Sequence, residues 1–236
     1  MERTGIIIVA GGSGTRCGGA LPKQFALLDG MPVLARTINV CAEALPGAEI
    51  VVVLPERYTA FWKDFADRFY VAEHRTATGG AERFDSVRRG IEALRSDPEL
   101  IAVQDGVRPL ASVGLIRRVA ADAARHGAAI PVIAAVDSLR EVECDAEEQI
   151  RASHIVDRRR FRIVQTPQIF RAELLRKAYD RPYMSEYTDD ASVVEAAGHN
   201  IFLSEGERSN LKITTPDDFV LAEALLAARE EAGSRE

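Results

Sequence analysis

A glycine-rich run follows the first apolar segment of the chain, at residues 10–19 (AGGSGTRCGG). Glycines at the carboxyl end of a buried strand let backbone N–H groups approach an anion without obstruction by side chains, and ligands of open α/β sheets bind at this edge. The run contains Arg16, and Lys23 follows after Pro22, whose ring stiffens the approach. The combination favours a triphosphate site over the alternative, a solvated surface loop.

Two common phosphate motifs do not fit this run. The dinucleotide fingerprint GxGxxG, entered at Gly12 and Gly14, requires a third glycine where Cys17 stands. The P-loop pattern can be entered at Gly14 and reaches Gly19, but Ala20 follows in place of lysine. The run is therefore predicted to be a phosphate loop of another kind.

Three further clusters have the composition of a site. Residues 78–86 (TGGAERFDS) are predicted to form a second glycine turn that opens a helix, and such N-termini bind anions or polar base edges. Asp105 ends a buried strand close to Arg108, and a strand-end carboxylate is a natural Mg²⁺ ligand when phosphates supply other oxygens. An Asp-Gly pair taken alone is more often only a turn. Residues 210–214 (NLKIT) place Lys212 in a short strand-like segment.

Short apolar runs alternate with amphipathic segments along most of the chain. Buried strands are predicted at residues 5–9, 49–54, 100–104 and 128–134, and helices at 32–43, 58–69, 83–94 and 115–125. Later in the chain we predict helices at 172–179 and 189–197, a strand at 200–204 and a final helix. This order predicts one α/β domain over residues 1–236, with a mostly parallel sheet covered by helices on both faces.

The alternation is interrupted at about residues 136–163, which are charged and have a turn-like centre at 144–148 (CDAEE). Their alternating flanks predict a β-hairpin that projects from the sheet as an arm, and a disordered charged loop is the alternative. In the final helix, Thr215 is a candidate cap and Pro216 stands at the first helical position. Residues 230–236 are predicted to be a frayed tail.

The composition argues against several classes of protein. The net charge of −6 is unlike that of a general nucleic-acid binder, and no apolar run approaches the roughly 20 residues needed to span a bilayer. The three cysteines and four histidines lack metal-ligand spacing, so we expect neither an intrinsic zinc site nor catalysis by histidine. The first residues lack the pattern of a secretory signal, and we expect a cytoplasmic protein.

In their order along the chain, these motifs resemble a known family. The segments GGSGTR, PKQF, GGAERFDSV, DGVRP, TPQ, TDDAS and NLKIT look like those of the 2-C-methyl-D-erythritol 4-phosphate cytidylyltransferases, which act in the non-mevalonate isoprenoid pathway. The matches run from residue 5 to about 220. The resemblance implies a Rossmann-like nucleotidyltransferase sheet with a projecting β-hairpin arm that completes a homodimer.

The resemblance also implies roles for individual residues. Arg16, Lys23 and Lys212 would be the catalytic cations at the CTP phosphates. CTP would be bound by Ala10, Gly11, Gly12, Gly14, Thr15, Gly79, Gly80, Arg83, Ser86, Asp105 and Gly106. Asp105 would also hold Mg²⁺. The polyol phosphate would contact Arg108, Thr166 and Thr188 of one subunit and, from the arm of a second subunit, Ser138 and Arg158.

The chain departs from the family in two places. Gln104, Gly106 and Val107 stand where the family often has a histidine and two alanines, although the neighbouring aspartate and arginine are retained. On the arm, Ser138 replaces a common threonine and Arg140 a common lysine, which keeps the hydroxyl and the charge but not the geometry of lysine. The arm is therefore the part of the sequence that says least about which substrate is bound.

The implied reaction is an in-line attack by the substrate phosphate on the α-phosphorus of CTP, which expels pyrophosphate. Because both reactants are anions, the reaction requires positioned cations and a metal, and no covalent nucleophile. Three alternatives stay open: a ribitol 5-phosphate cytidylyltransferase, a sugar-1-phosphate nucleotidyltransferase that uses another nucleotide, and a nucleotide-binding module without catalysis. CTP binding without release of pyrophosphate would favour the last.

Overall fold

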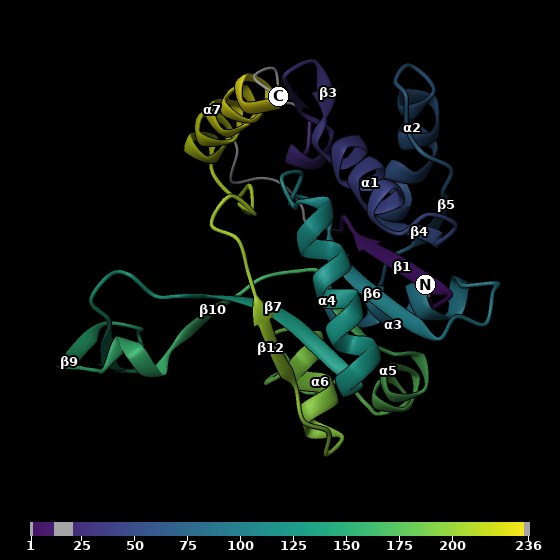
Figure 1. Ribbon diagram of the computed structural model, residues 1–236. Coiled ribbons are helices and arrows are strands. Elements are labelled where there is room, and N and C mark those ends of the chain that lie inside the picture. Colours follow the sequence, from purple (N-terminus) through teal and green to yellow (C-terminus); the bar gives the residue numbers. More distant parts are fainter. Residues whose placement is uncertain (1, 12–20, 234–236) are drawn as a thin grey trace.

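A central eight-stranded sheet organises the computed structural model, which describes residues 2–11 and 21–233 (Figure 1). Its strands pair in the order β10-β7-β11-β6-β1-β4-β5, and β12 pairs with β7. The strands are β1 (Thr4–Val9), β4 (Glu49–Leu54), β5 (Arg75–Thr78), β6 (Leu100–Asp105), β7 (Ala128–Ala134), β10 (Arg162–Val164), β11 (Gln168–Arg171) and β12 (Phe202–Glu205). The pairs β1–β4, β1–β6, β4–β5 and β7–β12 are parallel, whereas β10 and β11 run antiparallel to their neighbours. The predicted mostly parallel sheet is confirmed.

Helices cover both faces of the sheet, as predicted. One face carries α1 (Val33–Ala44), α2 (Glu56–Ala66) and α4 (Val113–His126), and the other carries α3 (Arg83–Ala93), α5 (Ala172–Tyr179) and α6 (Asp190–Ala196). Successive side chains of a strand point to opposite faces, so Ile6 and Ile8 of β1 join the first core while Ile7 joins the second. This two-faced burial explains why the strand sequences are continuously apolar.

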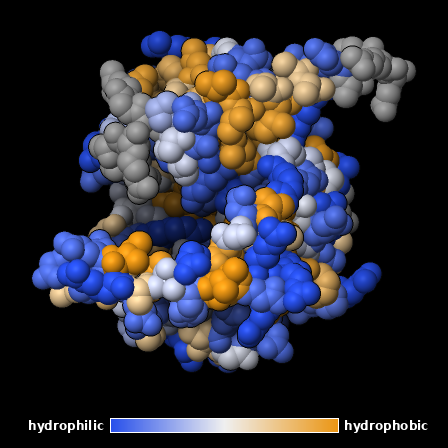
Figure 2. Space-filling model, turned by 90° about the vertical axis from the view of Figure 1, so that its left-hand side faces the viewer, coloured by the Kyte–Doolittle hydropathy of each residue, from blue (hydrophilic) through white to orange (hydrophobic). Residues whose placement is uncertain are grey.

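A third apolar cluster anchors the last helix, α7 (Pro216–Gly233), against β2 (Leu27–Leu28), the start of α1 and the loop after β6. Strand β2 pairs with the equally short β3 (Met31–Pro32). Ala222 of α7 packs with Leu28 and Leu110 in this cluster, while Val220 and Leu221 stay exposed. Figure 2 shows hydrophobic side chains gathered at the top of this side of the molecule. None of the described helices is long and apolar enough to cross a membrane.

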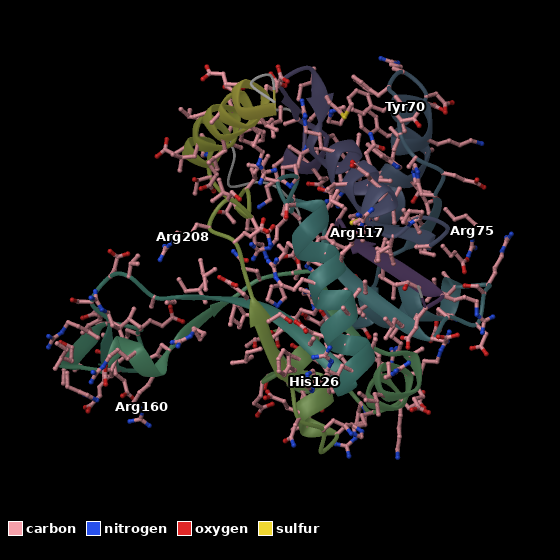
Figure 3. The ribbon with its side chains drawn as sticks, viewed as in Figure 1. Tyr70, Arg75, Arg117, His126, Arg160 and Arg208 are labelled. Atoms are coloured by element: carbon pink, nitrogen blue, oxygen red, sulfur yellow. The ribbon has the colours of Figure 1, made fainter. Side chains whose placement is uncertain are left out.

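The interrupted region forms the predicted hairpin. Strands β8 (Arg140–Cys144) and β9 (Ile150–Ile155) pair antiparallel, a short 3-10 turn η3 (Arg158–Arg160) follows, and β10 returns to the sheet. The hairpin projects from the body of the protein (Figure 1), and Arg160 lies on it, far from the helical layers (Figure 3). Every residue of β8 and β9 is exposed.

The predicted elements need several corrections. Strands β5 and β11 were not expected, because each is only four residues long and its sequence (RTAT and QIFR) lacks the longer apolar run that marks a buried strand. The strand expected at residues 210–214 is irregular, although the Ile213 backbone N–H donates to the Val107 carbonyl at 2.9 Å. The frayed tail was placed too early, since α7 continues to Gly233.

Helix α7 begins at Pro216, as predicted. The side chain that accepts hydrogen bonds at its start is that of Asp218 and not that of the expected cap, Thr215. The Asp218 carboxylate accepts from the backbone N–H groups of Thr214 and Thr215, each at 2.7 Å. Burial alone would raise the pKa of Asp218, but these bonds and the Thr214 hydroxyl hold it below its ordinary value. An acidic residue in the first turn that reaches back to the cap is one half of a capping box.

Candidate active site

The start of the glycine-rich run, the glycine turn at Gly79–Gly80 and a carboxylate meet at the carboxyl ends of the central strands. The parallel register sets Val9 of β1 beside Asp105 of β6, so Gly11 follows one strand where Asp105 ends the next. A Cβ atom on Gly106 would lie 3.0 Å from that of Ala10 and 3.2 Å from the Val9 carbonyl oxygen. A Cβ atom at position 106 would therefore require these neighbours to shift by a few tenths of an ångström, so the two strand ends lie close together. The predicted residues Ala10, Gly11, Asp105 and Gly106 are thus brought together.

The second glycine turn is fixed by the first residues of α3. The Ser86 hydroxyl accepts from the Gly80 N–H and donates to the Glu82 carbonyl, both at 3.1 Å. A Cβ atom on Gly80 would lie 2.2 Å from that of Asp85, so only glycine fits there. A Cβ atom on Gly11 would lie 3.8 Å from the Ser86 oxygen, so the start of the glycine-rich run adjoins this turn. The predicted nucleotide residues Gly11, Gly79, Gly80 and Ser86 form one continuous surface.

Asp105 is the centre of a cluster of cations. Its carboxylate lies 3.0 Å from Lys212 Nζ, 3.4 Å from Arg108 Nε and 3.9 Å from Arg83 Nη2. Burial would raise the pKa of Asp105, but the charges of Lys212, Arg83 and Arg108 outweigh it and hold the pKa below its ordinary value. The carboxylate therefore stays ionised, with an excess of positive charge around it. An anionic ligand is attracted to such a cluster.

Arg108 and the residues behind it are held by a buried polar network. The Arg108 Nη1 group donates to the Asn210 carbonyl at 2.8 Å, and the Asn210 amide donates to the Thr166 carbonyl at 2.9 Å. The Thr166 hydroxyl oxygen accepts from the Asp105 N–H at 3.0 Å. Burial is the largest influence on Arg108 and lowers its pKa, against the opposing charge of Asp105. This network fixes Lys212 beside Asp105 although its segment is not a strand.

Lys23 lies in the short 3-10 turn η2 (Lys23–Phe25), which its neighbours attach to the body of the protein. The Gln24 amide donates to the Ala10 carbonyl at 2.9 Å, at the end of β1. The Phe25 ring is buried and stacks on Trp62, with centroids 5.7 Å apart. Lys23 is thus anchored next to the strand end at which the glycine-rich run begins. Four predicted residues, Gly12, Gly14, Thr15 and Arg16, lie outside the described residues.

The remaining predicted residues lie further apart. Thr188 is exposed just before α6, and its N–H donates to the Ser192 hydroxyl at 3.1 Å. Ser138 and Arg158 are exposed on the arm, where the Arg158 guanidinium donates to the Val136 carbonyl. Within the described residues the arm projects away from the sheet, and the fold of one chain does not gather these two residues with Asp105. Arg208, which was not among the predicted residues, lies on the segment that links β12 to α7 (Figure 3).

Sequence analysis missed Asp190, a residue on which the cluster depends. Its fully buried carboxylate accepts two bonds from Arg83, at 3.0 Å from Nη1 and 2.6 Å from Nη2, and one from the Tyr179 hydroxyl at 2.6 Å. The only signal was its place in the TDDAS segment, where two adjacent aspartates could equally have been surface residues.

The site can accommodate Mg²⁺ only with oxygens from a ligand. No group of three or more His, Cys, Asp or Glu side chains that could hold a metal occurs among the described residues. Asp105 offers one ionised carboxylate, whose Oδ1 has Arg83 at 3.9 Å while Oδ2 faces Arg108 and Lys212. Mg²⁺ is commonly bound by one or two carboxylates together with substrate phosphates. The donor set therefore fits a metal that arrives with a polyphosphate.

Taken together, the fold and the site define an α/β protein whose sheet carries, at its carboxyl edge, glycines and cations of the kind that suit a nucleotide phosphate. Comparison with known proteins specifies this class. The family model described as IspD, 2-C-methyl-D-erythritol 4-phosphate cytidylyltransferase, matches residues 4–228. A protein of that name from Bacteroides thetaiotaomicron is 44% identical over 222 residues, which cover 94% of this chain and 98% of the relative.

Solved structures agree with this result. The 2-C-methyl-D-erythritol 4-phosphate cytidylyltransferase of Thermus thermophilus is 35% identical and superposes with a TM-score of 0.71, over 95% of this chain and 98% of that one. The 4-diphosphocytidyl-2C-methyl-D-erythritol synthase of Anaerococcus prevotii has a TM-score of 0.77 at 26% identity, over 96% and 99% of the two chains. The chain belongs to the 2-C-methyl-D-erythritol 4-phosphate cytidylyltransferase family.

Proposed function

We propose that this chain transfers the cytidylyl group of CTP to the phosphate of 2-C-methyl-D-erythritol 4-phosphate and releases pyrophosphate, and that it does so as a homodimer with Mg²⁺. The observation that carries the proposal is the ionised Asp105 surrounded by three cations, beside Gly11 and the glycine turn at Gly79–Gly80. The names of the similar proteins favour methylerythritol phosphate over ribitol 5-phosphate and favour catalysis over nucleotide binding alone.

Each part of the site has a role in this reaction. The glycine turns at Gly11 and at Gly79–Gly80 admit the nucleotide close to the backbone, because no side chain stands in the way. Lys23 and Lys212 would neutralise the oxygens of the α-phosphate as its charge rises during attack, together with Arg16. Asp105 would hold Mg²⁺ with the phosphates, and the bound ion would neutralise and orient them.

The acceptor phosphate needs a second set of donors, at a point in line with the α-phosphorus. Arg108 and Thr166, next to Asp105, would place this phosphate, and Thr188 would contact the polyol. Both phosphates are anions and repel each other in water. The cations of the site would offset this repulsion and hold the two groups in position. The reaction requires no covalent intermediate with the protein.

The arm supports the homodimer in this proposal. A two-stranded hairpin is at best marginally stable by itself, and the arm exposes Ile150 by 65% and Ile155 by 72%. A second copy would cover these side chains, and it would bring Ser138 and Arg158 to the acceptor subsite of its neighbour. A two-fold dimer of this kind makes the exchange reciprocal.

Substrate choice tests the proposal directly. Purified protein should release pyrophosphate in a Mg²⁺-dependent reaction from CTP and methylerythritol phosphate, and much less from ATP, GTP or UTP. The measurement is initial pyrophosphate release with each nucleotide and with a panel of polyol phosphates. Turnover of ribitol 5-phosphate that equals or exceeds that of methylerythritol phosphate would reassign the acceptor, and CTP binding without any release would reassign the protein as a binding module.

A further inference from the structure

Two carboxylates share one guanidinium at the edge of the site. Arg83 Nη2 lies 2.6 Å from Asp190 Oδ2 and 3.9 Å from Asp105 Oδ1. The Arg83 guanidinium binds Asp190 through both of its terminal nitrogens, which is the strongest geometry for this pair. Arg83 is therefore directed toward Asp190 and held just beyond contact with Asp105.

The position of Asp190 is itself fixed from several sides. Its side chain is fully buried and accepts the Tyr179 hydroxyl at 2.6 Å. Burial and the charge of Asp190 raise the pKa of Tyr179, so the phenol keeps its proton and donates. The start of α6 is attached to β11 by Gln168, whose amide donates to Asp189 and accepts from the Ala191 N–H, at 2.8 and 2.9 Å.

Arg83 is anchored on its own side as well. Phe84, the next residue, stacks on Tyr179 with ring centroids 4.7 Å apart and on Tyr187 at 5.7 Å. The start of α3 is thus packed against the α5–α6 segment through both an ion pair and aromatic rings. The separation between Arg83 and Asp105 is set by this packing.

The two carboxylate oxygens of Asp105 have different neighbours. Lys212 and Arg108 already face Oδ2, whereas Oδ1 has only the distant Arg83 nitrogen among its ion pairs in the described residues. If Arg83 lost its partner, Asp105 would be the other carboxylate within its reach, and contact would place a third cation on the oxygen that remains for a metal. Repulsion between that cation and a divalent ion would weaken metal binding.

We propose that Asp190 is a positioning residue that holds Arg83 away from Asp105, and so keeps Asp105 Oδ1 available to the divalent cation. This inference rests on the proposed role of Asp105 toward Mg²⁺. It assigns Asp190 a function in the reaction although the fully buried Asp190 side chain exposes no surface to a ligand.

The test is a titration of the protein–CTP complex with Mn²⁺, without the polyol phosphate, followed by the paramagnetic resonance of free Mn²⁺. Asp190→Asn removes the charge and keeps the size of the side chain. Its half-saturating Mn²⁺ concentration should rise about tenfold, because Arg83 moves from 3.9 Å into contact with Asp105. Tyr179→Phe, which removes one hydrogen bond to Asp190 but no charge, should lower thermal stability and leave Mn²⁺ binding unchanged.

A double variant separates this mechanism from a general loss of structure. Because Arg83 is also a predicted CTP contact, each variant is titrated at a CTP concentration that saturates it, measured beforehand. Under that condition Asp190→Asn/Arg83→Met has no guanidinium to move, so its half-saturating Mn²⁺ concentration should be at or below that of the wild type. Thermal unfolding of each variant shows that it is folded at the temperature of the titration. If Asp190→Asn alone does not fold, the Mn²⁺ binding of the double variant decides. Weakened binding would overturn the inference, and binding at least as tight as wild type would support it.

Three results would overturn the inference. These are unchanged Mn²⁺ binding by folded Asp190→Asn, weakened binding that persists in the double variant, and an equal loss in Tyr179→Phe. A wild-type complex that bound no Mn²⁺ would contradict the metal role of Asp105 in the proposed function, and this inference with it. The two failures are therefore distinguishable.

Discussion

Lys23→Ala should lower kcat about 10²–10³-fold, the scale observed when one preorganised electrostatic group is removed from an active site. Lys23 lies in a turn that Gln24 joins to the end of β1 and that the buried Phe25 anchors in the first core. Its charge is therefore held close to the phosphate-binding edge and needs no rearrangement during the reaction. Lys212 is less suitable for this test, because its removal would also change the environment of Asp105.

The chain offers matched controls for this substitution. Two of its four lysines, Lys63 of α2 and Lys177 of α5, are exposed on helices away from the site. Lys63→Ala and Lys177→Ala should keep wild-type kcat, and all three variants should unfold at nearly the wild-type temperature. A Lys23→Ala enzyme with kcat within a few-fold of wild type, or equal losses in the controls, would show that Lys23 does not stabilise the transition state.

Two inactive subunits should restore activity when they form a mixed dimer. The arm exposes Val142, Ile150, Ile155 and Phe161, and its side-chain bonds, such as Arg140 to Ser153, stay within the hairpin. If the arm completes the site of a second copy, Arg158 acts in trans to Lys23. A dimer of one Lys23→Ala and one Arg158→Ala subunit then has one site with both changes and one site with neither.

Random pairing at a 1:1 ratio makes half of the dimers mixed, and each mixed dimer has one intact site. The recovered activity should be about a quarter of the wild-type value. Arg160→Ala, an exposed arginine two positions along the same arm, serves as the matched control and should stay active as a homodimer. If mixed dimers are demonstrated but activity equals the sum of the two mutants, the arm serves its own subunit.

The sheet and the glycine turns could be predicted because their signals are local. Continuous β-branched runs marked β1 and β4, a longer apolar run marked β7, and the glycines that follow a buried strand marked the predicted phosphate edge. Parallel pairing then brings Gly11 and Asp105 together without further information, since the carboxyl ends of neighbouring strands coincide. Strands β5 and β11 carried no such signal, because their short sequences depend on pairing partners for their conformation.

The Arg83–Asp190 pair could not be predicted. The two residues are 107 positions apart, and the sequence gives charged residues no sign of burial. Charged side chains are mostly exposed unless they are paired, so nothing in the sequence marked Asp190 as buried. Lys212 was placed in the site by its motif, but its position depends on the Asn210 network and not on a strand.

The central claim is that positioned cations promote a direct transfer, without a covalent bond to the protein. The stereochemical course at the α-phosphorus tests it most directly, with CTP made chiral there by one sulfur atom. A single in-line displacement by the methylerythritol phosphate predicts a product with inverted configuration at that phosphorus, determined by phosphorus magnetic resonance after stereospecific conversion. Retention of configuration would mean two displacements and a covalent cytidylyl-protein intermediate, and it would contradict the account.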